Sequence, residues 1–363
     1  MPRISRLPEK TRRTHNTTRI PRMGLFSFLT QEIAIDLGTA NTIIIQNDKV
    51  VVDEPSIIAR DRTTNKTVAV GRTAQQMHGK THENIKTIRP LKDGVIADFH
   101  AAEDMIKGMI KMIARGKGLF QPSLRMVICI PSGITEVEKR AVKDSAEHAG
   151  AKEVYLIHEP MAAAIGIGID VEEPMGNMVI DIGGGTSEIA VIALGGIVTD
   201  KNIRVAGDEL TQDIEEYMRR QHNILIGERT AEQIKIEVGA ALPELDSPPA
   251  DYNVRGRDLM TGIPKEIAVS YSEIAHALDK SISKIEEAIM SCLEHTPPEL
   301  SADIYKTGIY LAGGGALLRG LDKRISMKTK LPVHVADDPL RAVARGTGIA
   351  LKNINKFQFL MRE

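Results

Sequence analysis

Asp36 and Asp181 each end a short apolar segment and precede a glycine turn with small hydroxyl residues. The two segments read Ile35-Asp36-Leu37-Gly38-Thr39-Ala40-Asn41-Thr42 and Ile180-Asp181-Ile182-Gly183-Gly184-Gly185-Thr186-Ser187. Glycine lets a turn bring its backbone N–H groups against an anion with no Cβ in the way. A carboxylate beside the turn can hold a hydrated Mg²⁺, which prefers oxygen ligands and keeps most of its waters. The residues therefore predict two phosphate-binding turns, each with an aspartate for the metal.

Each of these turns joins two strands of a predicted β-hairpin. Apolar runs precede the aspartates at residues 33–35 and 178–180, and β-branched runs follow at 43–45 and 189–192. One glycine turn alone is weak evidence, because most such turns only reverse the chain. The duplication favours the phosphate site, since two facing hairpins would clamp a nucleotide's phosphates between two related domains.

A third glycine cluster follows an apolar run at residues 309–318, where Gly313, Gly314 and Gly315 come between a predicted strand and a predicted helix. A helix N-terminus with bare backbone suits an anion or a flat ring close to the chain. An ordinary strand-to-helix connection has the same pattern. A dinucleotide-binding fold is disfavoured, because no cluster has Gly-x-Gly-x-x-Gly spacing with an acidic residue about 20 positions later.

Composition indicates a folded protein with room for two domains. The 363 residues are 42% hydrophobic and 26% charged. A net charge of −1, 3% aromatic residues and no Trp give no general attraction to nucleic acid. Cys129 and Cys292 are expected in the core in a reducing compartment. No apolar run approaches the roughly 18 residues that span a bilayer, so we expect a cytosolic chain.

Residues 1–22 form a basic arm without apolar periodicity, and we expect it to be disordered. From Gln31 onward predicted strands and helices alternate, which favours an α/β architecture. The clearest elements are a buried strand at 126–130, helices at 136–150 and 270–294, and a surface loop at 242–257.

Several segments together resemble the MreB/Mbl family of bacterial actins, within the actin, Hsp70 and sugar-kinase superfamily. The resemblance spans Met23 to about Lys356, and Thr186-Ser187 replaces the family's usual Thr-Thr. The segments that carry it are the two hairpins, Arg89-Pro90-Leu91-Lys92-Asp93-Gly94-Val95-Ile96-Ala97-Asp98, Glu159-Pro160-Met161-Ala162-Ala163-Ala164-Ile165-Gly166 and Thr296-Pro297-Pro298-Glu299-Leu300.

The resemblance implies an actin-like ATPase fold of two related domains, each with a mixed sheet flanked by helices and with the nucleotide in the cleft between them. Domain I would comprise residues 23–170 and 336–357, and domain II residues 171–335. It implies ATP with Mg²⁺, the metal lying between Asp36 and Asp181. The residues implied in phosphate binding are Gly38, Thr39, Ala40, Asn41, Gly183, Gly184, Gly185 and Thr186.

The family match also places two segments on either side of the adenosine. They are Glu232-Gln233-Ile234-Lys235 and Gly313-Gly314-Gly315-Ala316-Leu317. By spacing alone, Glu232 and Lys235 are an ordinary i,i+3 pair on a helix surface.

Hydrolysis needs an attacking water held in line with the γ-phosphate. The resemblance assigns that water to Glu159, as the group that orients or deprotonates it, with help from the Thr186 hydroxyl. Taken alone, Glu159 is equally well an acid that stabilises a helix N-terminus. His158 is interpreted as a bystander, and the histidines form no evident metal site.

Two apolar segments suit membrane contact: Leu25, Phe26, Phe28 and Leu29 behind the basic arm, and Leu119-Phe120 in a loop. Such pairs often pack into a core instead, but the family's inserting loop matches the second. The resemblance thus implies a filament on the inner face of the cytoplasmic membrane that directs cell-wall growth and rod shape. Its partners would be further copies of itself and the wall-elongation proteins RodZ, MreC and MreD.

Two other classes of function compete with this interpretation. A metabolic kinase of the same superfamily would need an Asp base and an acceptor pocket, and neither is evident in the sequence. An Hsp70-type chaperone would need a substrate-binding domain after the ATPase fold, and none follows.

Overall fold

The computed structural model describes residues 30–113 and 123–362. The basic arm and the membrane candidates Leu25, Phe26, Phe28, Leu29, Leu119 and Phe120 lie outside the described residues.

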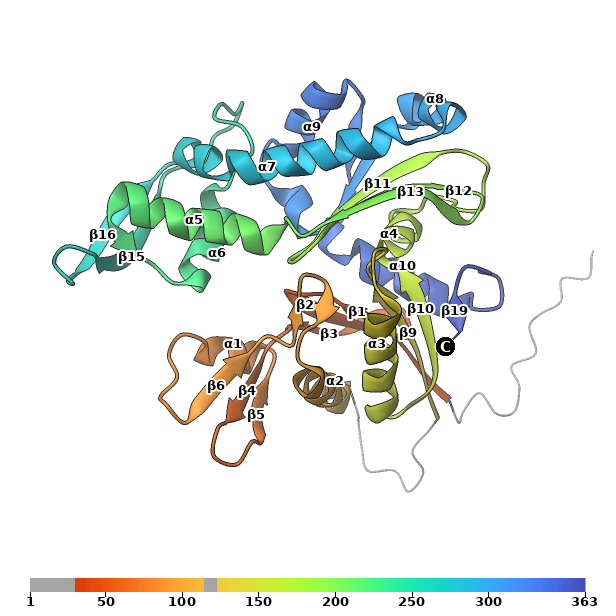
Figure 1. Ribbon diagram of the computed structural model, residues 1–363, viewed down its shortest axis with the longest axis horizontal. Helices are drawn as coiled ribbons and strands as arrows, with labels where there is room; N and C mark the ends of the chain where they lie inside the picture. The colour runs from red at the N-terminus through yellow and green to blue at the C-terminus, as the bar shows by residue number, and fades with distance from the viewer. Residues whose placement is uncertain (1–29, 114–122, 363) are drawn as a thin grey trace, which may run out of the picture.

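The first body, which we call domain I, is built on a six-stranded mixed sheet (Figure 1). The hairpin strands β1 and β2 are antiparallel, whereas β1, β9 and β10 run parallel. In spatial order the strands are β19 (Met361–Arg362), β10 (Ala151–His158), β9 (Ser123–Ile130), β1 (Thr30–Leu37), β2 (Asn41–Gln46) and β3 (Lys49–Pro55). Helices α2 (Phe99–Ile113) and α3 (Glu136–His148) pack against this sheet.

The second body, domain II, is built on a five-stranded sheet of the same design (Figure 1). Its hairpin strands β11 and β12 are antiparallel, and β17 runs parallel to β11. The order is β13 (Gly196–Ile203), β12 (Ser187–Ala193), β11 (Asn177–Ile182), β17 (Ile309–Ala312) and β18 (Val333–Val335). The helices here are α5 (Gly207–His222), α6 (Glu228–Val238), α7 (Tyr271–Glu294), α8 (Pro298–Thr307) and α9 (Leu321–Thr329).

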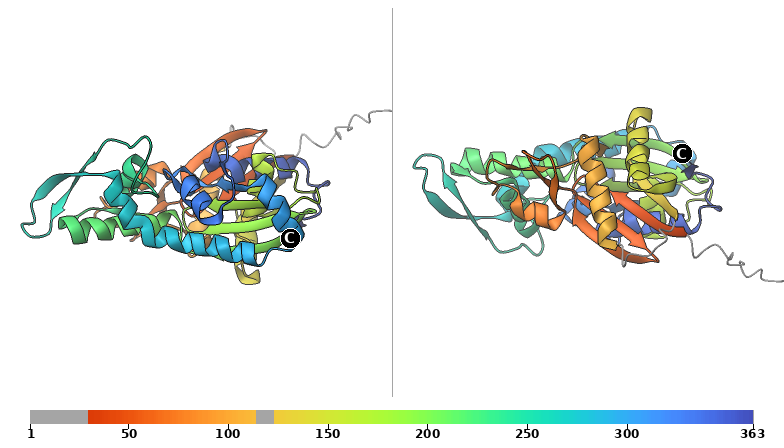
Figure 2. Two further views of the ribbon diagram at one scale, coloured as in Figure 1. Left: turned by 90° about the horizontal axis from the view of Figure 1, so that it is seen from above. Right: turned by 90° about the horizontal axis from the view of Figure 1, so that it is seen from below.

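Smaller sheets extend both domains at one end of the molecule, and the β15–β16 hairpin projects furthest there (Figure 2). Domain I carries β4 (Ile58–Asp61), β5 (Thr67–Val70), β6 (Ile85–Ile88) and helix α1 (Arg72–Met77), and a short hairpin of β7 (Leu91–Lys92) and β8 (Val95–Ile96). Domain II carries β14 (Ile224–Leu225), β15 (Tyr252–Asp258) and β16 (Pro264–Val269).

Two helices join the domains: α4 (Glu159–Ile167) and α10 (Ala342–Lys352). Helix α4 leaves β10 of domain I and packs on β11 and β12, whereas α10 follows domain II and packs on β1, β2 and β9. The helices touch where Gly166 and Gly346 face each other, because a Cβ on Gly346 would lie only 1.8 Å from the carbonyl oxygen of Ala162. Glycine at these positions allows backbone-to-backbone contact between the domains.

The buried apolar side chains form three large clusters: one in each domain and one that both domains share. In β1, Ile33 and Ile35 face the α2–α3 core, whereas Ala34 faces the α4–α10 core that both domains share. In β11, Ile180 faces the domain II core and Val179 faces the shared one. Both central sheets are therefore covered on both faces, which explains their nearly continuous apolar strands.

The predicted helices at 136–150 and 270–294 are confirmed as α3 and α7, and each begins with a capping box. Thr135 and Glu138 exchange hydrogen bonds at the start of α3, as Ser270 and Glu273 do at α7, so two otherwise orphan donors are satisfied at each helix. Among the described residues no helix is long and apolar enough to cross a membrane.

Two local predictions are wrong. Residues 252–257 belong to β15, paired along its length with β16, although the sequence predicts a loop over 242–257. The third glycine cluster leads first into a 3₁₀ turn, η2 (Gly314–Leu317), and the α-helix begins only at Leu321.

Candidate functional site

The two predicted phosphate turns lie in contact between the domains. A Cβ on Gly184 would lie 2.8 Å from the Cβ of Ala40, and one on Gly185 would lie 2.8 Å from Thr39 Oγ1. No side chain fits at either position, so the backbone of this turn directly faces the turn of domain I. An anion held between the hairpins would meet N–H groups rather than side chains.

A third turn, Asp93-Gly94 between β7 and β8, completes this contact. The Gly94 N–H donates a hydrogen bond to Thr39 Oγ1 at 2.9 Å, and a Gly94 Cβ would lie 3.0 Å from Thr186 Cγ2. Both turn residues have positive φ, 51° and 78°. No role for this turn is evident from the sequence alone. Its Asp-Gly dipeptide is the usual signal for a two-residue hairpin and could have located it.

Asp36 and Asp181 are the carboxylates of the two hairpins; Asp36 is half-buried and Asp181 is buried. Burial raises the pKa of Asp36 to about 6, although the Cys129 thiol, which donates to its Oδ1 at 3.2 Å, favours the ionised form. Burial and the nearby Asp36 raise the pKa of Asp181 to about 7. Asp181 Oδ1 has no hydrogen-bond partner among the described residues.

This unsatisfied oxygen fits a cation held in the cleft. Within residues 30–113 and 123–362 no three His, Cys, Asp or Glu side chains converge to hold a metal alone. A Mg²⁺ ion beside Asp36 and Asp181 would therefore take its remaining ligands from water and phosphate, as Mg²⁺ usually does.

The raised pKa of Asp181 gives a testable stability effect. Unfolded aspartate has a pKa of about 3.9, so between about pH 4 and pH 7 the folded chain binds more protons than the unfolded one. Without metal or nucleotide, the wild-type carboxyl of Asp181 thus destabilises the fold progressively as pH rises. The free energy of unfolding falls by about 1.4 kcal/mol for each pH unit between pH 4 and pH 7. We expect Asp181→Asn to raise the free energy of unfolding by a few kcal/mol at pH 8 and to leave it unchanged near pH 4. Urea titrations in EDTA measure this, and equal effects at both pH values would contradict it.

Glu159 begins α4 at the end of β10, and its side chain is 9% exposed. Desolvation raises its pKa well above the ordinary value, and the neighbouring Glu188, Asp181 and Asp36 raise it further. Strong perturbation of this kind is typical of groups that exchange protons in active sites. Thr186, the other predicted hydrolytic residue, is buried at the end of the Gly183–Gly185 turn. The structure therefore brings the two predicted hydrolytic residues and both aspartates together where the two domains meet.

Glu188 is a further buried carboxylate beside Asp181 and Glu159, and it was not among the residues predicted from the sequence. It lies on β12 directly opposite Asp181 on β11. Desolvation raises its pKa to about 8. A lone glutamate inside an apolar strand, two residues after Thr186, was the available signal.

The predicted adenosine segment of α6 is linked to the second turn through α5. Lys235 Nζ donates to the carbonyl oxygen of Gly207 at 2.7 Å and lies 2.6 Å from Glu232. The Gly207 N–H in turn donates to Gly183 O at 3.1 Å. Gln233 faces solvent, whereas Ile234 is part of the domain II core. Glu232 and Lys235 are therefore the members of this segment that lie near the hairpin.

The third glycine cluster packs directly on the second hairpin. A Cβ on Gly313 would lie 2.3 Å from Ile182 O and 2.5 Å from Asp181 Oδ1, and one on Gly315 would lie 2.2 Å from Ile182 Cγ2. Leu317 is 54% exposed beside this contact. These glycines bring the β17–η2 connection to the metal-binding candidate Asp181.

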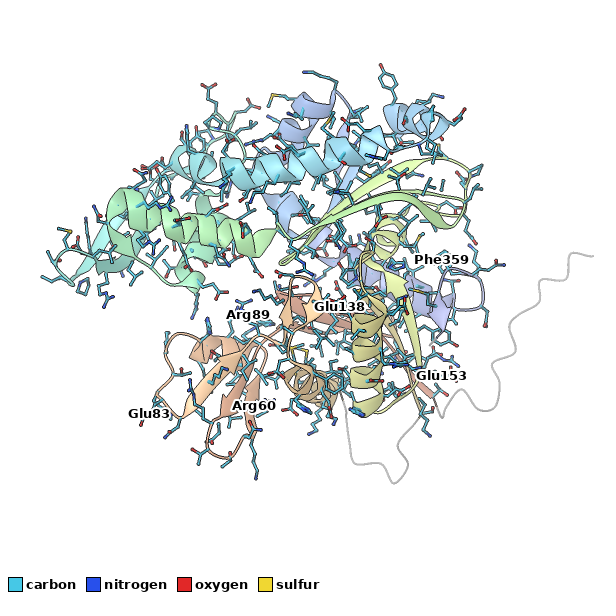
Figure 3. All side chains as sticks on the ribbon, in the orientation of Figure 1. Arg60, Glu83, Arg89, Glu138, Glu153 and Phe359 are labelled. Carbon is cyan, nitrogen blue, oxygen red and sulfur yellow. The ribbon has the colours of Figure 1, made fainter. Side chains whose placement is uncertain are left out.

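Glu228, the first residue of α6, bridges the two domains. Its carboxylate forms an ion pair with Arg89 and lies 3.2 Å from His78 Nε2. The other ring nitrogen of His78 contacts Thr87 Oγ1 at 2.8 Å. Arg89 lies on the side of domain I that faces α6 (Figure 3). Side chains that directly follow α1 and β6 of domain I thus meet one carboxylate of domain II.

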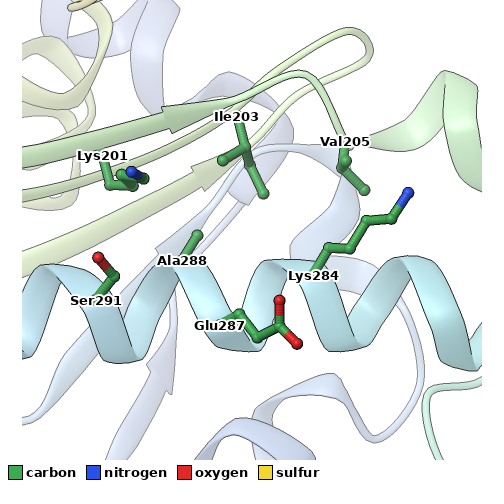
Figure 4. Close-up of a pocket in the computed structure, with 7 residues that line it drawn as sticks. All are labelled: Lys201, Ile203, Val205, Lys284, Glu287, Ala288 and Ser291. Atoms are coloured by element: carbon green, nitrogen blue, oxygen red, sulfur yellow. The ribbon is translucent and has the colours of Figure 1, made fainter.

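A separate hollow of about 370 Å³ lies between β13 and α7 (Figure 4). None of the hairpin, hydrolytic or adenosine candidates lines it. Its lining residues are Lys201, Ile203, Val205, Lys284, Glu287, Ala288 and Ser291.

Comparison with known protein families identifies the family to which this chain belongs. The family model described as MreB/Mbl protein matches residues 30–359. The chain belongs to the MreB/Mbl family. The cell shape-determining protein Mbl of Bacillus subtilis (strain 168) is 49% identical over 327 residues, which are 90% of this chain and 97% of that protein. The cell shape-determining protein MreB of Escherichia coli (strain K12) is 48% identical, over 92% of this chain and 95% of that protein.

Solved structures confirm the predicted actin-like fold with two sheet-helix domains. MreB5 of Spiroplasma citri bound to AMPPNP superposes with a TM-score of 0.85 at 40% identity, over 90% of this chain and 97% of that one. The MamK double helical filament superposes with a TM-score of 0.74 at 21% identity, over 90% and 99%. The second likeness is one of fold alone.

Proposed function

We propose that this family member binds ATP, polymerises, and hydrolyses ATP slowly as it does so. The filament would lie on the inner face of the cytoplasmic membrane and direct cell-wall synthesis and rod shape. The observation that carries the proposal is the contact of two glycine turns between two domains of one design, one turn beside the half-buried Asp36 and the other beside the buried Asp181. The solved structures of MreB5 with AMPPNP and with ADP, and relatives named cell shape-determining proteins, support it.

In this proposal the backbone N–H groups of the two turns surround the phosphates of ATP, and the Gly94 N–H holds the Thr39 hydroxyl in place beside them. A bound Mg²⁺ would supply positive charge to the phosphate oxygens, held through water by Asp36 and Asp181. Glu159, desolvated in the same cleft, accepts a proton from the attacking water, and the Thr186 hydroxyl orients that water. Because burial raises the pKa values of Asp181, Glu159 and Glu188, the positive charge of a bound metal would favour their ionised forms.

Electron microscopy of the purified chain with Mg·ATP tests the proposal most directly, together with release of inorganic phosphate. Filaments with slow phosphate release are expected. A soluble monomer that instead phosphorylates a small metabolite would identify the kinase alternative.

Asp181→Asn should bind Mg·ATP at least 10-fold more weakly, although it stabilises the nucleotide-free chain. Unchanged affinity would remove Asp181 from the nucleotide site.

Membrane attachment is the part of the proposal that rests on sequence alone. Burying a Leu or Phe side chain in lipid is worth roughly 1.5–3 kcal/mol, whereas each basic residue of the arm adds only about 1 kcal/mol and is screened by salt. We therefore expect Leu119→Ser with Phe120→Ser to reduce co-sedimentation of polymer with liposomes more than deletion of residues 1–22 does.

The control for this prediction is filament formation in the absence of lipid, which the double variant should keep. If it pellets with liposomes as well as wild type, Leu119 and Phe120 are not the anchor, and residues 25–29 become the remaining candidate. RodZ, MreC and MreD stay proposed partners, and pull-down with each from cells of the source organism would test them.

A further inference from the structure

Glu188 has no exposed surface and no part in the mechanism above. An unpaired carboxylate in a protein interior is costly, so a fully buried one is retained only with specific hydrogen bonds. Along β12 it follows Ser187 and precedes a wholly apolar run, and Asp181 is its cross-strand partner. The contacts of its two oxygens show what holds it there.

The carboxylate of Glu188 accepts hydrogen bonds from both domains. The Ser132 N–H, in the turn after β9 of domain I, donates to it at 3.0 Å and 3.3 Å. Asn202 Nδ2, on β13 of domain II, donates at 2.5 Å. These hydrogen bonds offset part of the cost of removing the carboxyl group from water. Glu188 therefore ties a turn of domain I to two strands of domain II at the floor of the cleft.

That turn is next to both hydrolytic residues. Strands β9 and β10 are parallel neighbours with Ile130 beside His158, so Pro131-Ser132 and Glu159 leave the same sheet edge. Gly94 packs between Pro131 and Thr186, because a Cβ on Gly94 would lie 3.0 Å from Pro131 Cγ and 3.0 Å from Thr186 Cγ2. Movement of the Ser132 turn would therefore displace the surroundings of Glu159 and Thr186 together.

We propose that Glu188 is a positioning residue of the hydrolytic site, which holds the Pro131–Ser132 turn against domain II and so fixes Glu159 relative to Thr186. The inference rests on the proposed ATP hydrolysis and deepens it. Its rival is a purely structural role, in which Glu188 contributes to folding and nothing else. The two differ in what happens to turnover when the fold is kept.

The test exploits the direction of the hydrogen bonds. Glu188→Gln can still accept from the Ser132 N–H, but its NH₂ group then meets the NH₂ group of Asn202, so two donors face each other. Adding Asn202→Asp restores a donor and an acceptor at this contact. We expect Glu188→Gln to lower kcat for phosphate release at least 10-fold, with KM for ATP within 2-fold, and the double variant to recover most of kcat.

A matched control is Glu286→Gln, which also removes a buried carboxylate. Glu286 lies on α7 and pairs with Arg324 at 3.0 Å, with no contact to the cleft turns. It should lower the melting temperature and leave kcat unchanged. Phosphate release is measured on pelleted polymer, so that a change in assembly is not counted as a change in turnover.

The outcomes separate this inference from the proposed function. If Glu159→Gln releases phosphate like wild type, the hydrolytic assignment itself fails. If Glu159→Gln is inactive while Glu188→Gln retains wild-type kcat, only the role of Glu188 is overturned. Should Glu188→Gln not fold, Asn202→Ala removes one partner and leaves the carboxylate. A several-fold loss of kcat supports the inference, and an unchanged kcat overturns it.

Discussion

Gly346→Ala will strongly destabilise the folded protein. The new Cβ would lie 1.8 Å from Ala162 O, 2.7 Å from Ala162 C and 2.9 Å from Gly166 N. All three are backbone atoms, so no rotamer change relieves the overlap and α4 and α10 must move apart within the shared core. Overpacking of a close-packed interior commonly costs 1–3 kcal/mol. Because this one separates two backbones, we expect about 3 kcal/mol or more, a large fraction of a typical folding free energy.

Gly348→Ala on the same helix is the matched control. Its Cβ would meet only the Ile45 side chain, at 3.2 Å, and replacing helical glycine by alanine gains about 1 kcal/mol of helix propensity. We expect its stability to stay within about 1 kcal/mol of wild type. Soluble yield and urea unfolding followed by circular dichroism compare the two variants. Equal stability of both would show that the helices can separate at little cost.

Glu159→Gln will stop turnover while leaving binding and assembly in place. General-base catalysis contributes roughly 10²–10⁴-fold, so phosphate release should fall by that factor. The pKa of Glu159 is raised well above its usual range by burial. Its neutral form is thus favoured in the nucleotide-free chain, and an isosteric neutral amide should not lower stability.

Phosphate release under polymerising conditions checks this prediction, alongside filament pelleting and affinity for a non-hydrolysable ATP analogue. Retained filaments without phosphate are expected. Wild-type release would reduce Glu159 to an acid that stabilises the start of α4.

The sequence predicts those parts of the molecule that depend on neighbouring residues. The two hairpins, α3 and α7 are each encoded by local turns, caps and periodicity, and the structure confirms them. The loop prediction over 242–257 rests on Pro243, Pro248, Pro249 and Gly256, which are typical of loops. The strand β15 forms there because it pairs along its length with β16, which follows after a turn.

The missed site residues depend on contacts distant in sequence. Glu188 has a role only because Ser132, 56 residues earlier, meets it across the domain boundary. The turn at Gly94 reaches Thr39 over 55 residues. No local sequence pattern predicts which turn of one domain will face a given strand of the other domain. The family resemblance supplied the positions of Glu159 and Thr186, but it carried no information on their supporting residues.

The bridge of Glu228 to Arg89 and His78 bears on how long a ligand stays in the cleft. Two partners share one carboxylate, so the loss of either contact leaves the other at high effective concentration, and the first readily re-forms. Separation of α6 from domain I at this point then requires both contacts to be absent at the same time. Slower separation lengthens the residence time of a ligand held between the domains, and it favours the closed arrangement at equilibrium as well. Arg89 and Glu228 are partly exposed, so salt would shorten that residence time, and the exchange rate of a trapped ligand would follow ionic strength.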